Sequence, residues 1–387
     1  MPPDRYDVII AGAGPAGSIC ARACAKAGIR TLLLERDTFP RFKPCGGAVS
    51  ERAIALLGLP LPPDLIEREC FGARIHFRDH RIEIRKDCRI AVMVSRERFD
   101  HYLADRAVDA GAVLRQNEPV QGVSVSSDRV EVRTDQERYE ARCVVGADGA
   151  NSIVGRTVRP LFARDEMAVA LVGTVPAGDR EIDDRLSGLL DMHFGVARMG
   201  YGWVFPHRGY YGVGVMGRAS EFEDPLTVFS AFAASVGLPA PRPQGHTIPW
   251  GGFPRTVVGP RTLLAGDAAG LADPFHGEGI YSAILSGKLA AQAVVEGIGG
   301  KKDTLPRYAA ECGRLIVQEK RIALRMAQLL HRYPRVFLEL FFTDAEALDR
   351  YLDIAAGRSD YAQFQRWLLK RLPRALVATL FRGTGRR

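Results

Sequence analysis

The opening of this chain constrains its fold more than any other stretch of the sequence. Residues 6–11 have the composition of a buried strand, residues 12–17 read Gly-Ala-Gly-Pro-Ala-Gly, and residues 18–28 carry a helical pattern. A second apolar strand follows at residues 31–34. This order predicts a Rossmann-type unit in which a tight turn joins a buried strand to a helix.

Each glycine of the turn has a separate physical role. We expect Gly12 to make the turn, Gly14 to let a pyrophosphate approach the helix N-terminus, and Gly17 to let helix and strand pack closely. Glu35 follows Gly17 by eighteen residues, close to the spacing of an acid that binds an adenosine ribose. These features predict a dinucleotide site, for which the alternative is a glycine turn in an ordinary α/β unit.

Composition places the chain among globular proteins with room for two subdomains. It has 387 residues, of which 47% are hydrophobic and 25% are charged. No apolar run reaches the length of a spanning helix, and the N-terminus leads almost directly into the first strand, so we expect a cytoplasmic protein. The seven cysteines are scattered without zinc-ligand spacing, which predicts reduced thiols and no metal site.

Charge is concentrated near the C-terminus. Residues 301–387 hold 18 Lys or Arg against 9 Asp or Glu, whereas the rest of the chain is close to neutral. A basic segment favours an anionic partner. Because the sequence has no recognition helix or RNA-binding motif, we expect a membrane surface and no nucleic acid.

The middle of the chain alternates between strand and helix patterns. Short strands between residues 73 and 94 predict a small sheet, and residues 96–110 predict an amphipathic helix. Strands between 113 and 145 are expected to return to the first sheet. Residues 167–217 contain four strand-like segments without helical patterns between them, which predicts a separate antiparallel sheet.

The remaining elements complete a three-part organisation. Residues 225–236 predict a helix, residues 262–265 predict a buried strand, and the chain after 280 is helical in pattern. We therefore predict three parts, which are a discontinuous nucleotide-binding domain of residues 1–160 and 246–300, a substrate domain of residues 161–245, and a helical region of residues 301–387.

Three further stretches carry ligand-binding signals. Asp148 and Asp267 each follow a predicted buried strand, at the edge where α/β sheets bind ligands. The turn at residues 277–279 opens a helix, whose free N–H groups would suit the negative charge of a reduced flavin ring. In the loop at residues 39–47, two prolines restrict the path and two glycines allow a flat ligand to approach.

These motifs stand in an order that resembles the flavoproteins of the para-hydroxybenzoate hydroxylase fold. Within that group, four segments are similar to the geranylgeranyl reductase family: Lys43-Pro44-Cys45-Gly46-Gly47, Arg96-Glu97-Arg98-Phe99-Asp100, Tyr201-Gly202-Trp203-Val204-Phe205-Pro206 and Gly277-Glu278-Gly279-Ile280-Tyr281. The resemblance covers residues 5 to about 295.

The resemblance implies a mixed α/β fold that binds FAD. It implies a Rossmann-like FAD-binding domain, an inserted antiparallel-sheet substrate domain and a helical C-terminal tail. In such proteins Glu35 would bind the adenosine ribose and Asp267 the ribityl chain. The predicted cofactor-binding residues are Gly12, Gly14, Ala16, Gly17, Glu35, Arg36, Cys45, Gly46, Arg96, the backbone of Val120, Asp148, Asp267, Gly279 and Ile280.

Two positions depart from the family pattern. The Asp148 motif has one residue more before Arg156 than the usual form, and this affects the role of Arg156. His207 stands where a lysine commonly follows the Phe-Pro pair, and this affects the identity of the substrate.

The resemblance also implies a reaction. Such enzymes saturate carbon-carbon double bonds in prenyl chains of lipids or chlorophyll-type pigments. NADPH or reduced ferredoxin would supply the electrons transiently, the second as an electron-donor protein. An isolated alkene is unpolarised, so a proton must arrive with the hydride and water must be excluded. We assign the proton to the Cys45 thiol. The alternative is that position 45 only needs a small side chain, for clearance. The predicted substrate-binding residues are Tyr201, Trp203, Phe205 and His276, with Tyr210 and Tyr211 as further members of an aromatic wall.

Two other functions fit the same fold. One is a flavin monooxygenase or halogenase, but the halogenase motif has two tryptophans and this chain offers only Trp203 there. The other is a prenyl-lipid escort protein without redox chemistry, although such a protein need not keep the flavin-ring motif at residues 277–280. Oxygen-independent turnover and a flavin spectrum, respectively, would exclude them.

Residues 361–387 show a basic amphipathic pattern that predicts docking on a membrane. Apolar residues recur at spacings of three and four with cations between them, and Pro373 divides the segment into two short helices. The alternative is that this face packs on the core of the protein itself.

Overall fold

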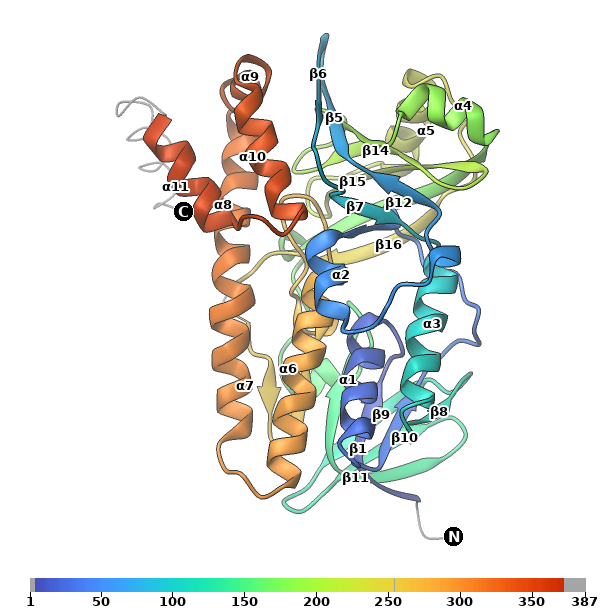
Figure 1. The fold of residues 1–387 in the computed structure, drawn as a ribbon. Helices are drawn as coiled ribbons and strands as arrows, with labels where there is room; N and C mark the ends of the chain where they lie inside the picture. Colours follow the sequence, from blue (N-terminus) through green and yellow to red (C-terminus); the bar gives the residue numbers. More distant parts are fainter. Residues whose placement is uncertain (1–3, 254, 372–387) are drawn as a thin grey trace.

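The computed structural model describes residues 4–253 and 255–371 (Figure 1). An eight-stranded sheet and its helices form one end of the molecule, a seven-stranded sheet forms the other, and the last four helices lie beside the second sheet (Figure 1). The fold is mixed α/β with a helical C-terminal part, as the sequence predicts. No helix among the described residues combines the length and the apolar character needed to cross a bilayer.

The eight-stranded sheet is built on the N-terminal strand. β1 pairs in parallel with β2 on one side and with β11 on the other, and β18 continues the parallel order. β9 and β10 form an antiparallel extension. Its strands are β1 (Asp4–Ala11), β2 (Thr31–Leu34), β8 (Val113–Arg115), β9 (Val120–Val125), β10 (Val130–Thr134), β11 (Arg138–Gly146), β17 (Val258–Gly259) and β18 (Thr262–Leu264). The predicted return of residues 113–145 and 262–265 to the first sheet is confirmed.

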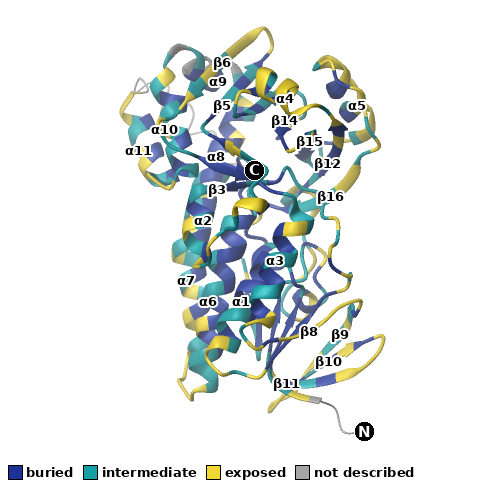
Figure 2. Ribbon diagram, turned by 45° about the vertical axis from the view of Figure 1, so that its right-hand side comes forward, coloured by how far each residue is buried: buried dark blue, intermediate teal, exposed yellow. Residues whose placement is uncertain are grey.

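Small side chains let the helices of this half pack closely. The helices are α1 (Pro15–Lys26), α3 (Arg96–Val108), α6 (Ile280–Ile298) and α7 (Thr304–Cys312). A Cβ atom added to Gly287 of α6 would stand 2.4 Å from the Ala16 carbonyl oxygen of α1, so only glycine allows this approach. Cys20 and Cys24 of α1 are fully buried in the same layer. Figure 2 shows α1 largely in the colour of buried residues.

The seven-stranded sheet runs in the order β16-β12-β15-β14-β13-β5-β6. Its strands are β5 (Gly72–Phe77), β6 (His80–Arg85), β12 (Met167–Pro176), β13 (Leu189–Phe194), β14 (Tyr201–Pro206), β15 (Tyr210–Arg218) and β16 (Gln244–Pro249). Neighbouring strands are antiparallel except β5 and β13, which are parallel. Helices α4 (Asp179–Leu186) and α5 (Pro225–Ser235) pack against one face.

Two predictions about this region are wrong. The segments between residues 73 and 94 do not form a sheet of their own, because β5 and β6 join the seven-stranded sheet while β7 (Ala91–Met93) pairs with β3 (Ala48–Ser50) and β4 (Arg68–Cys70). A helix, α4, does lie between β12 and β13. The sheet therefore takes strands from outside residues 161–245, and the proposed domain boundaries stay a prediction.

The C-terminal helices pack beside the seven-stranded sheet. They are α8 (Gln318–Arg332), α9 (Pro334–Thr343), α10 (Ala345–Ala355) and α11 (Tyr361–Arg371), while the short α2 (Glu51–Leu57) lies near α6 and α10. A π-helical segment, Gly313–Val317, joins α7 to α8, and 3-10 turns lie at Pro63–Leu65, Val154–Thr157, Arg164–Glu166 and Gly266–Ala269.

The apolar face of α11 is buried within the protein. Tyr361, Phe364 and Leu368 are 0%, 2% and 6% exposed and belong to the core shared with α8 and the seven-stranded sheet. For residues 361–371 the prediction of membrane docking through this face is therefore wrong, because the alternative of core packing holds. The rest of the predicted segment, residues 372–387, lies outside the described residues.

Candidate functional site

The turn before α1 has the shape of a phosphate cradle. A Cβ atom at Gly17 would stand 1.9 Å from the Gly12 carbonyl oxygen, and one at Gly12 would stand 2.4 Å from the Ala147 carbonyl oxygen. Gly14, by contrast, has no heavy atom within 4 Å of such a position. The open space in front of Gly14, at the N-terminus of a 12-residue helix, fits the pyrophosphate of FAD. Ala16, which is 5% exposed, lies in the first turn of that helix.

Glu35 lies beside this turn at the end of β2. Its side chain is 5% exposed, and one carboxylate oxygen accepts the Ala13 N–H at 2.9 Å. The Glu118 N–H donates to the Glu35 carbonyl oxygen at 2.9 Å, so the start of β9 near Val120 is close to this acid. Arg36 is exposed and pairs with the neighbouring Asp37 at 3.1 Å. The placement of Glu35 suits a ribose hydroxyl, and the roles of Arg36 and Val120 stay predictions.

A series of ion pairs connects Glu35 to the loop that carries Cys45. Arg41 lies 3.4 Å from the Glu35 carboxylate and 3.0 Å from Asp100, which is fully buried. Arg96 donates two hydrogen bonds of 2.8 Å to Asp100, and its guanidinium also contacts the Cys45 thiol. Asp100 ends one of the quoted motifs, but neither it nor Arg41 was in the predicted site, although the four-residue spacing of Arg96 and Asp100 on a helix was a usable signal.

Asp267 follows β18, as predicted, and lies against the start of α6. A Cβ atom at Gly279 would stand 3.4 Å from Asp267 Oδ1, and Ile280 is the first residue of α6. Lys43 Nζ lies 2.7 Å from His246 Nε2, which in turn lies 3.8 Å from Asp267 Oδ2. Burial lowers the pKa of Lys43 to about 8, against the opposing effect of Asp267. Burial alone would raise the pKa of Asp267, but His246 and Lys43 lower it.

This arrangement fits the flavin end of FAD. A buried carboxylate and the free N–H groups of a helix N-terminus provide the acceptor and donors that a ribityl chain and an isoalloxazine ring require. Lys43 and His246 were not in the predicted site. Lys43 belongs to a quoted motif and was within reach of sequence reasoning, whereas His246 lies in β16 with no motif around it.

The loop at residues 45–47, here called the thiol loop, contacts the aromatic side of β14. A Cβ atom at Gly46 would stand 3.0 Å from the Phe205 ring and 3.3 Å from Trp203 Nε1. The Cys45 sulfur accepts the Gly47 N–H at 3.4 Å. The absence of a side chain at Gly46 thus brings the thiol loop against the ring edges.

His207, which replaces the usual lysine, is part of this contact. Its Nε2 lies 3.1 Å from the Gly46 carbonyl oxygen and its Nδ1 lies 2.5 Å from Glu67 Oε2. The ring also stacks on Tyr210 at 4.5 Å. His207 therefore ties β14 to the thiol loop.

Three aromatic residues alternate along β14 and share one face. The ring centroids of Tyr201 and Trp203 are 5.8 Å apart, and those of Trp203 and Phe205 are 6.1 Å apart. All three belong to the core that faces the C-terminal helices. Tyr211 was wrongly predicted to join this wall, because it lies on the opposite face in a core with Phe229.

His276 joins this wall to the C-terminal helices. The Tyr201 hydroxyl donates to the His276 carbonyl oxygen at 2.6 Å. His276 Nδ1 lies 2.8 Å from the Tyr361 hydroxyl and 3.1 Å from Asp273, while Nε2 lies 3.3 Å from Glu278. Burial alone would lower the pKa of His276, but Asp273 and Glu278 raise it to about 9. The imidazole therefore holds a proton at neutral pH.

A buried ion pair supports this loop from α8. Lys320 and Asp273 are both fully buried, 2.8 Å apart, and the Tyr361 hydroxyl donates to Asp273 at 3.1 Å. Arg52 of α2 reaches Glu278 at 3.4 Å and Glu319 at 2.7 Å. Sequence reasoning missed this network, because its members come from distant segments and no local spacing connects them.

Asp148 turns toward its own loop. Ser152 donates to one carboxylate oxygen, and the Ile153 and Val154 N–H groups donate to the other at 2.7 and 3.2 Å. Burial raises the pKa of Asp148. Arg156 is exposed. In this structure Asp148 holds the turn after β11, and its contact with the cofactor stays a prediction.

Comparison with known proteins supports the same assignment. Residues 5–179 match the family model described as an FAD binding domain. The chain is 33% identical over 304 residues to the geranylgeranyl diphosphate reductase of Rhodobacter capsulatus, an alignment covering 75% of each protein.

Two solved structures share the fold. A geranylgeranyl bacteriochlorophyll reductase-like protein from Thermoplasma acidophilum matches with a TM-score of 0.74 and 24% identity, over 91% of this chain and 92% of that one. The flavin-dependent brominase Bmp2 matches with a TM-score of 0.73 and 19% identity, over 95% of this chain and 98% of that one. At these identities the structural likeness shows the fold alone.

Proposed function

Since this chain belongs to the geranylgeranyl reductase family of FAD-dependent oxidoreductases, we propose that it saturates double bonds of prenyl chains carried by lipids or chlorophyll-type pigments. The observation that carries this proposal is the contact between the thiol loop and the aromatic face of β14. It places an apolar wall beside the residues that fit FAD.

The reaction divides the work between cofactor and protein. Reduced FAD, when bound, supplies a hydride. The chain must hold the alkene in an apolar site, exclude water and deliver a proton to the second carbon. Tyr201, Trp203 and Phe205 are 5 to 7% exposed, and such rings bind a prenyl chain by apolar contact.

Two groups beside this wall are candidates for the proton donor. We assign the proton that is added to the alkene to the Cys45 thiol, because its loop contacts the β14 rings and the thiol interacts with Arg96. His276 is the second candidate, since its carbonyl contacts Tyr201 and its imidazole is protonated at neutral pH. We keep His276 as a proposed substrate-binding residue, because its carbonyl oxygen accepts the Tyr201 hydroxyl of the wall.

The test is a single turnover without oxygen. The flavoprotein is reduced with dithionite and mixed with a geranylgeranyl lipid, and mass spectrometry then measures the hydrogen added to each chain. Saturation without oxygen supports the proposal and excludes monooxygenase or halogenase turnover. The proposal is rejected if the bound, reduced flavin adds no hydrogen to the lipid and is reoxidised only when oxygen is admitted afterwards.

The Cys45 assignment has its own prediction. We expect Cys45→Ala to slow single turnover by about 100-fold or more, the usual contribution of a positioned acid. Cys88→Ala is the matched control, because Cys88 is another free cysteine and lies outside the site. Turnover of Cys45→Ala at the parent rate, with a loss in His276→Asn, would move the proton to His276.

Electron supply and membrane contact complete the proposal. The described residues contain one Rossmann-type unit, which FAD would occupy, so NADPH or reduced ferredoxin would act as a transient donor. A prenyl lipid does not diffuse freely through water, so we propose that the enzyme takes its substrate at an anionic membrane surface. Residues 372–387 are suited to that contact, because they contain four arginines and no acidic residue.

A further inference from the structure

A cluster of three metal-type ligands lies outside the FAD and substrate site. His76 of β5 and Asp191 and His193 of β13 have ligand atoms that all lie within 4.8 Å of one another. His193 contacts Phe232 of α5, so the cluster is on the sheet face opposite the β14 aromatic wall. The family resemblance and the proposed reaction assign no role to these residues.

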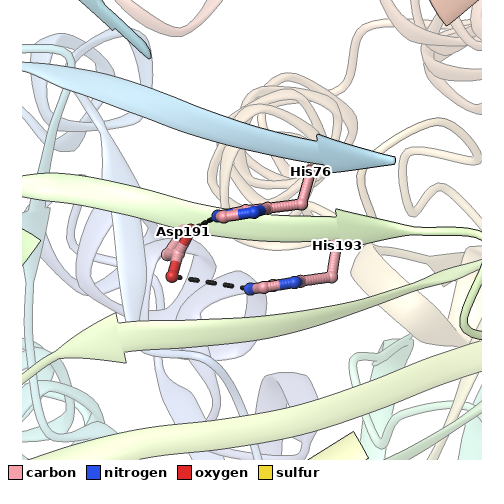
Figure 3. A group of neighbouring side chains, drawn as sticks. All are labelled: His76, Asp191 and His193. Atoms are coloured by element: carbon pink, nitrogen blue, oxygen red, sulfur yellow. Dashed lines mark hydrogen bonds and ion pairs between the residues drawn. The ribbon is translucent and has the colours of Figure 1, made fainter. Parts of the chain in front are cut away.

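The parallel pairing of β5 with β13 creates the cluster. His76 stands opposite His193 and Arg74 stands opposite Asp191, so all four side chains share one face. The two imidazole rings stack 4.1 Å apart, and their Nε2 atoms point to the same carboxylate (Figure 3). His76 Nε2 lies 2.8 Å from Asp191 Oδ1 and His193 Nε2 lies 3.5 Å from Oδ2.

One of these nitrogens has no hydrogen-bond partner. His193 Nε2 is buried, and its 3.5 Å contact with Asp191 is not a hydrogen bond. A buried polar atom without a partner is costly, and a cation placed between the carboxylate and the two imidazoles would satisfy it. Two nitrogens and one oxygen, with a fourth position for water, are a ligand set that Zn²⁺ accepts.

We propose that His76, Asp191 and His193 bind one zinc-type divalent ion. Zinc bonds to nitrogen and oxygen are about 2.0 to 2.2 Å long, so the cluster must contract slightly. The stacked rings must also turn about their side-chain bonds until both lone pairs meet at one point. Both motions are open to side chains that are 25% and 17% exposed for His76 and His193.

The neighbouring cation does not block this site. Arg74 lies 3.9 Å from Asp191, but its Nε donates to Glu83 at 2.6 Å and its Nη1 donates to the Arg185 carbonyl oxygen at 3.1 Å. These bonds direct the guanidinium toward Glu83 and the Arg185 carbonyl oxygen, with its Nη1 3.9 Å from Asp191 Oδ2. His193 Nε2 is buried, so the side chains must move to admit the ion.

An ion at this site would cross-link strands β5 and β13. β5 and β13 form the one parallel pair among the described strands of this sheet, and β5 comes from the N-terminal part of the chain. The ion would therefore cross-link two segments more than 100 residues apart. Because it binds the folded state, it would raise the thermal unfolding midpoint, by an amount that grows with the logarithm of its affinity.

The test uses the flavin-loaded protein after dialysis against a chelator. Zn²⁺ is titrated against a competing chelating dye, and Co²⁺ is followed by its absorption at wavelengths beyond those of the flavin. We expect one ion per chain, a tetrahedral Co²⁺ spectrum and a higher thermal midpoint. Asp191→Asn and His193→Asn should each weaken binding by more than about tenfold.

His101→Asn is the matched control. His101 also has an aspartate within reach, Asp105 at 3.5 Å, but the pair is exposed and offers two ligands instead of three. Its replacement should leave the high-affinity ion in place. The flavin spectrum and circular dichroism of each variant show that it has folded.

The proposal fails on any of three results. These are no stoichiometric ion in the parent protein, parent-like affinity in folded Asp191→Asn and His193→Asn, or an equal loss in His101→Asn. The parent titration decides the matter even where a variant does not fold.

Discussion

Asp267 is the residue on which we expect FAD binding to depend most directly. Its carboxylate lies against the α6 N-terminus and is balanced in this structure by Lys43 and His246. We expect Asp267→Asn to weaken FAD binding by about 1 to 3 kcal/mol, the contribution of a charge-assisted hydrogen bond. Titration of the FAD-free protein, followed by flavin fluorescence, measures this change.

Asp105→Asn is the control for that titration, because Asp105 is exposed on α3 and outside the site. Its FAD affinity should equal that of the parent. Equal affinity in Asp267→Asn would mean that another group holds the ribityl chain.

The raised pKa of His276 makes the unfolding free energy of the protein depend on pH. Its folded-state pKa of about 9 lies above its ordinary value of 6.5, so the folded protein keeps a proton that the unfolded chain loses. The stabilisation is complete below pH 6.5 and is lost as the pH rises through 9. The shift sets an upper limit of about 3 kcal/mol.

Denaturant unfolding of the parent and of His276→Gln measures this effect. The difference in unfolding free energy between the two proteins should shrink as the pH rises from neutral to alkaline. His101→Gln, a change at an exposed histidine, should show no such trend. A difference that stays constant with pH would assign the role of His276 to neutral hydrogen bonding.

Single residues were predictable from the sequence where a short motif fixed their surroundings. Glu35 and Cys45 lie where their motifs place them, beside the glycine turn and the β14 aromatic face. Lys320, Asp273 and Tyr361 were not predictable, because long-range packing alone brings them together. His76 and Asp191 are hidden in the same way, since strand pairing creates their contact.

At the scale of elements, the packing of α8 depends on the buried ion pair between Lys320 and Asp273. Lys320 is fully buried and pairs with Asp273, so its replacement would remove one of the two cations that face this buried carboxylate and leave His276 as the other. We expect Lys320→Met to destabilise the protein by about 3 to 5 kcal/mol. The double variant Lys320→Met/Asp273→Asn should recover part of that loss.

Lys301→Met is the matched control, because Lys301 is half-exposed in a surface pair with Glu296. It should change the unfolding free energy by less than about 1 kcal/mol. Similar effects for Lys320 and Lys301 would show that the buried pair contributes no more than a surface pair.

Element types were predictable where the periodicity was long, and element partners were not. The strands of the first sheet and the helix that starts at Ile280 follow their patterns. β5 and β6 have the expected strand pattern, but β5 pairs with β13 in the seven-stranded sheet, because period-two alternation gives no information on the partner strand. The helix α4 was missed because eight mostly charged residues hide its short apolar face, Ile182 and Leu186.

At the scale of the whole molecule, the amphipathic segment that the sequence presents as one unit divides into a buried helix, α11, and residues 372–387, to which we assign membrane contact as a proposal. The pattern is continuous from Tyr361 onward, yet the face of α11 is buried and Tyr361 contacts the His276 loop. Amphipathic periodicity indicates that a face will be covered, but the tertiary structure decides what covers it. Only the residues after α11 are therefore available to the membrane proposal.

Two truncations separate these two parts of the segment. Removal of residues 372–387 should abolish flotation with anionic liposomes while leaving bound FAD and the thermal midpoint unchanged. Each arginine near an anionic surface contributes about 1 kcal/mol, so added salt should have the same effect on the full chain. Removal of residues 361–387 should in addition lower the thermal midpoint, because it deletes Tyr361, Phe364 and Leu368 from the core. Equal flotation of the full chain and the shorter truncation, or flotation that is insensitive to salt, would assign membrane contact to another surface and leave the last sixteen residues without this role.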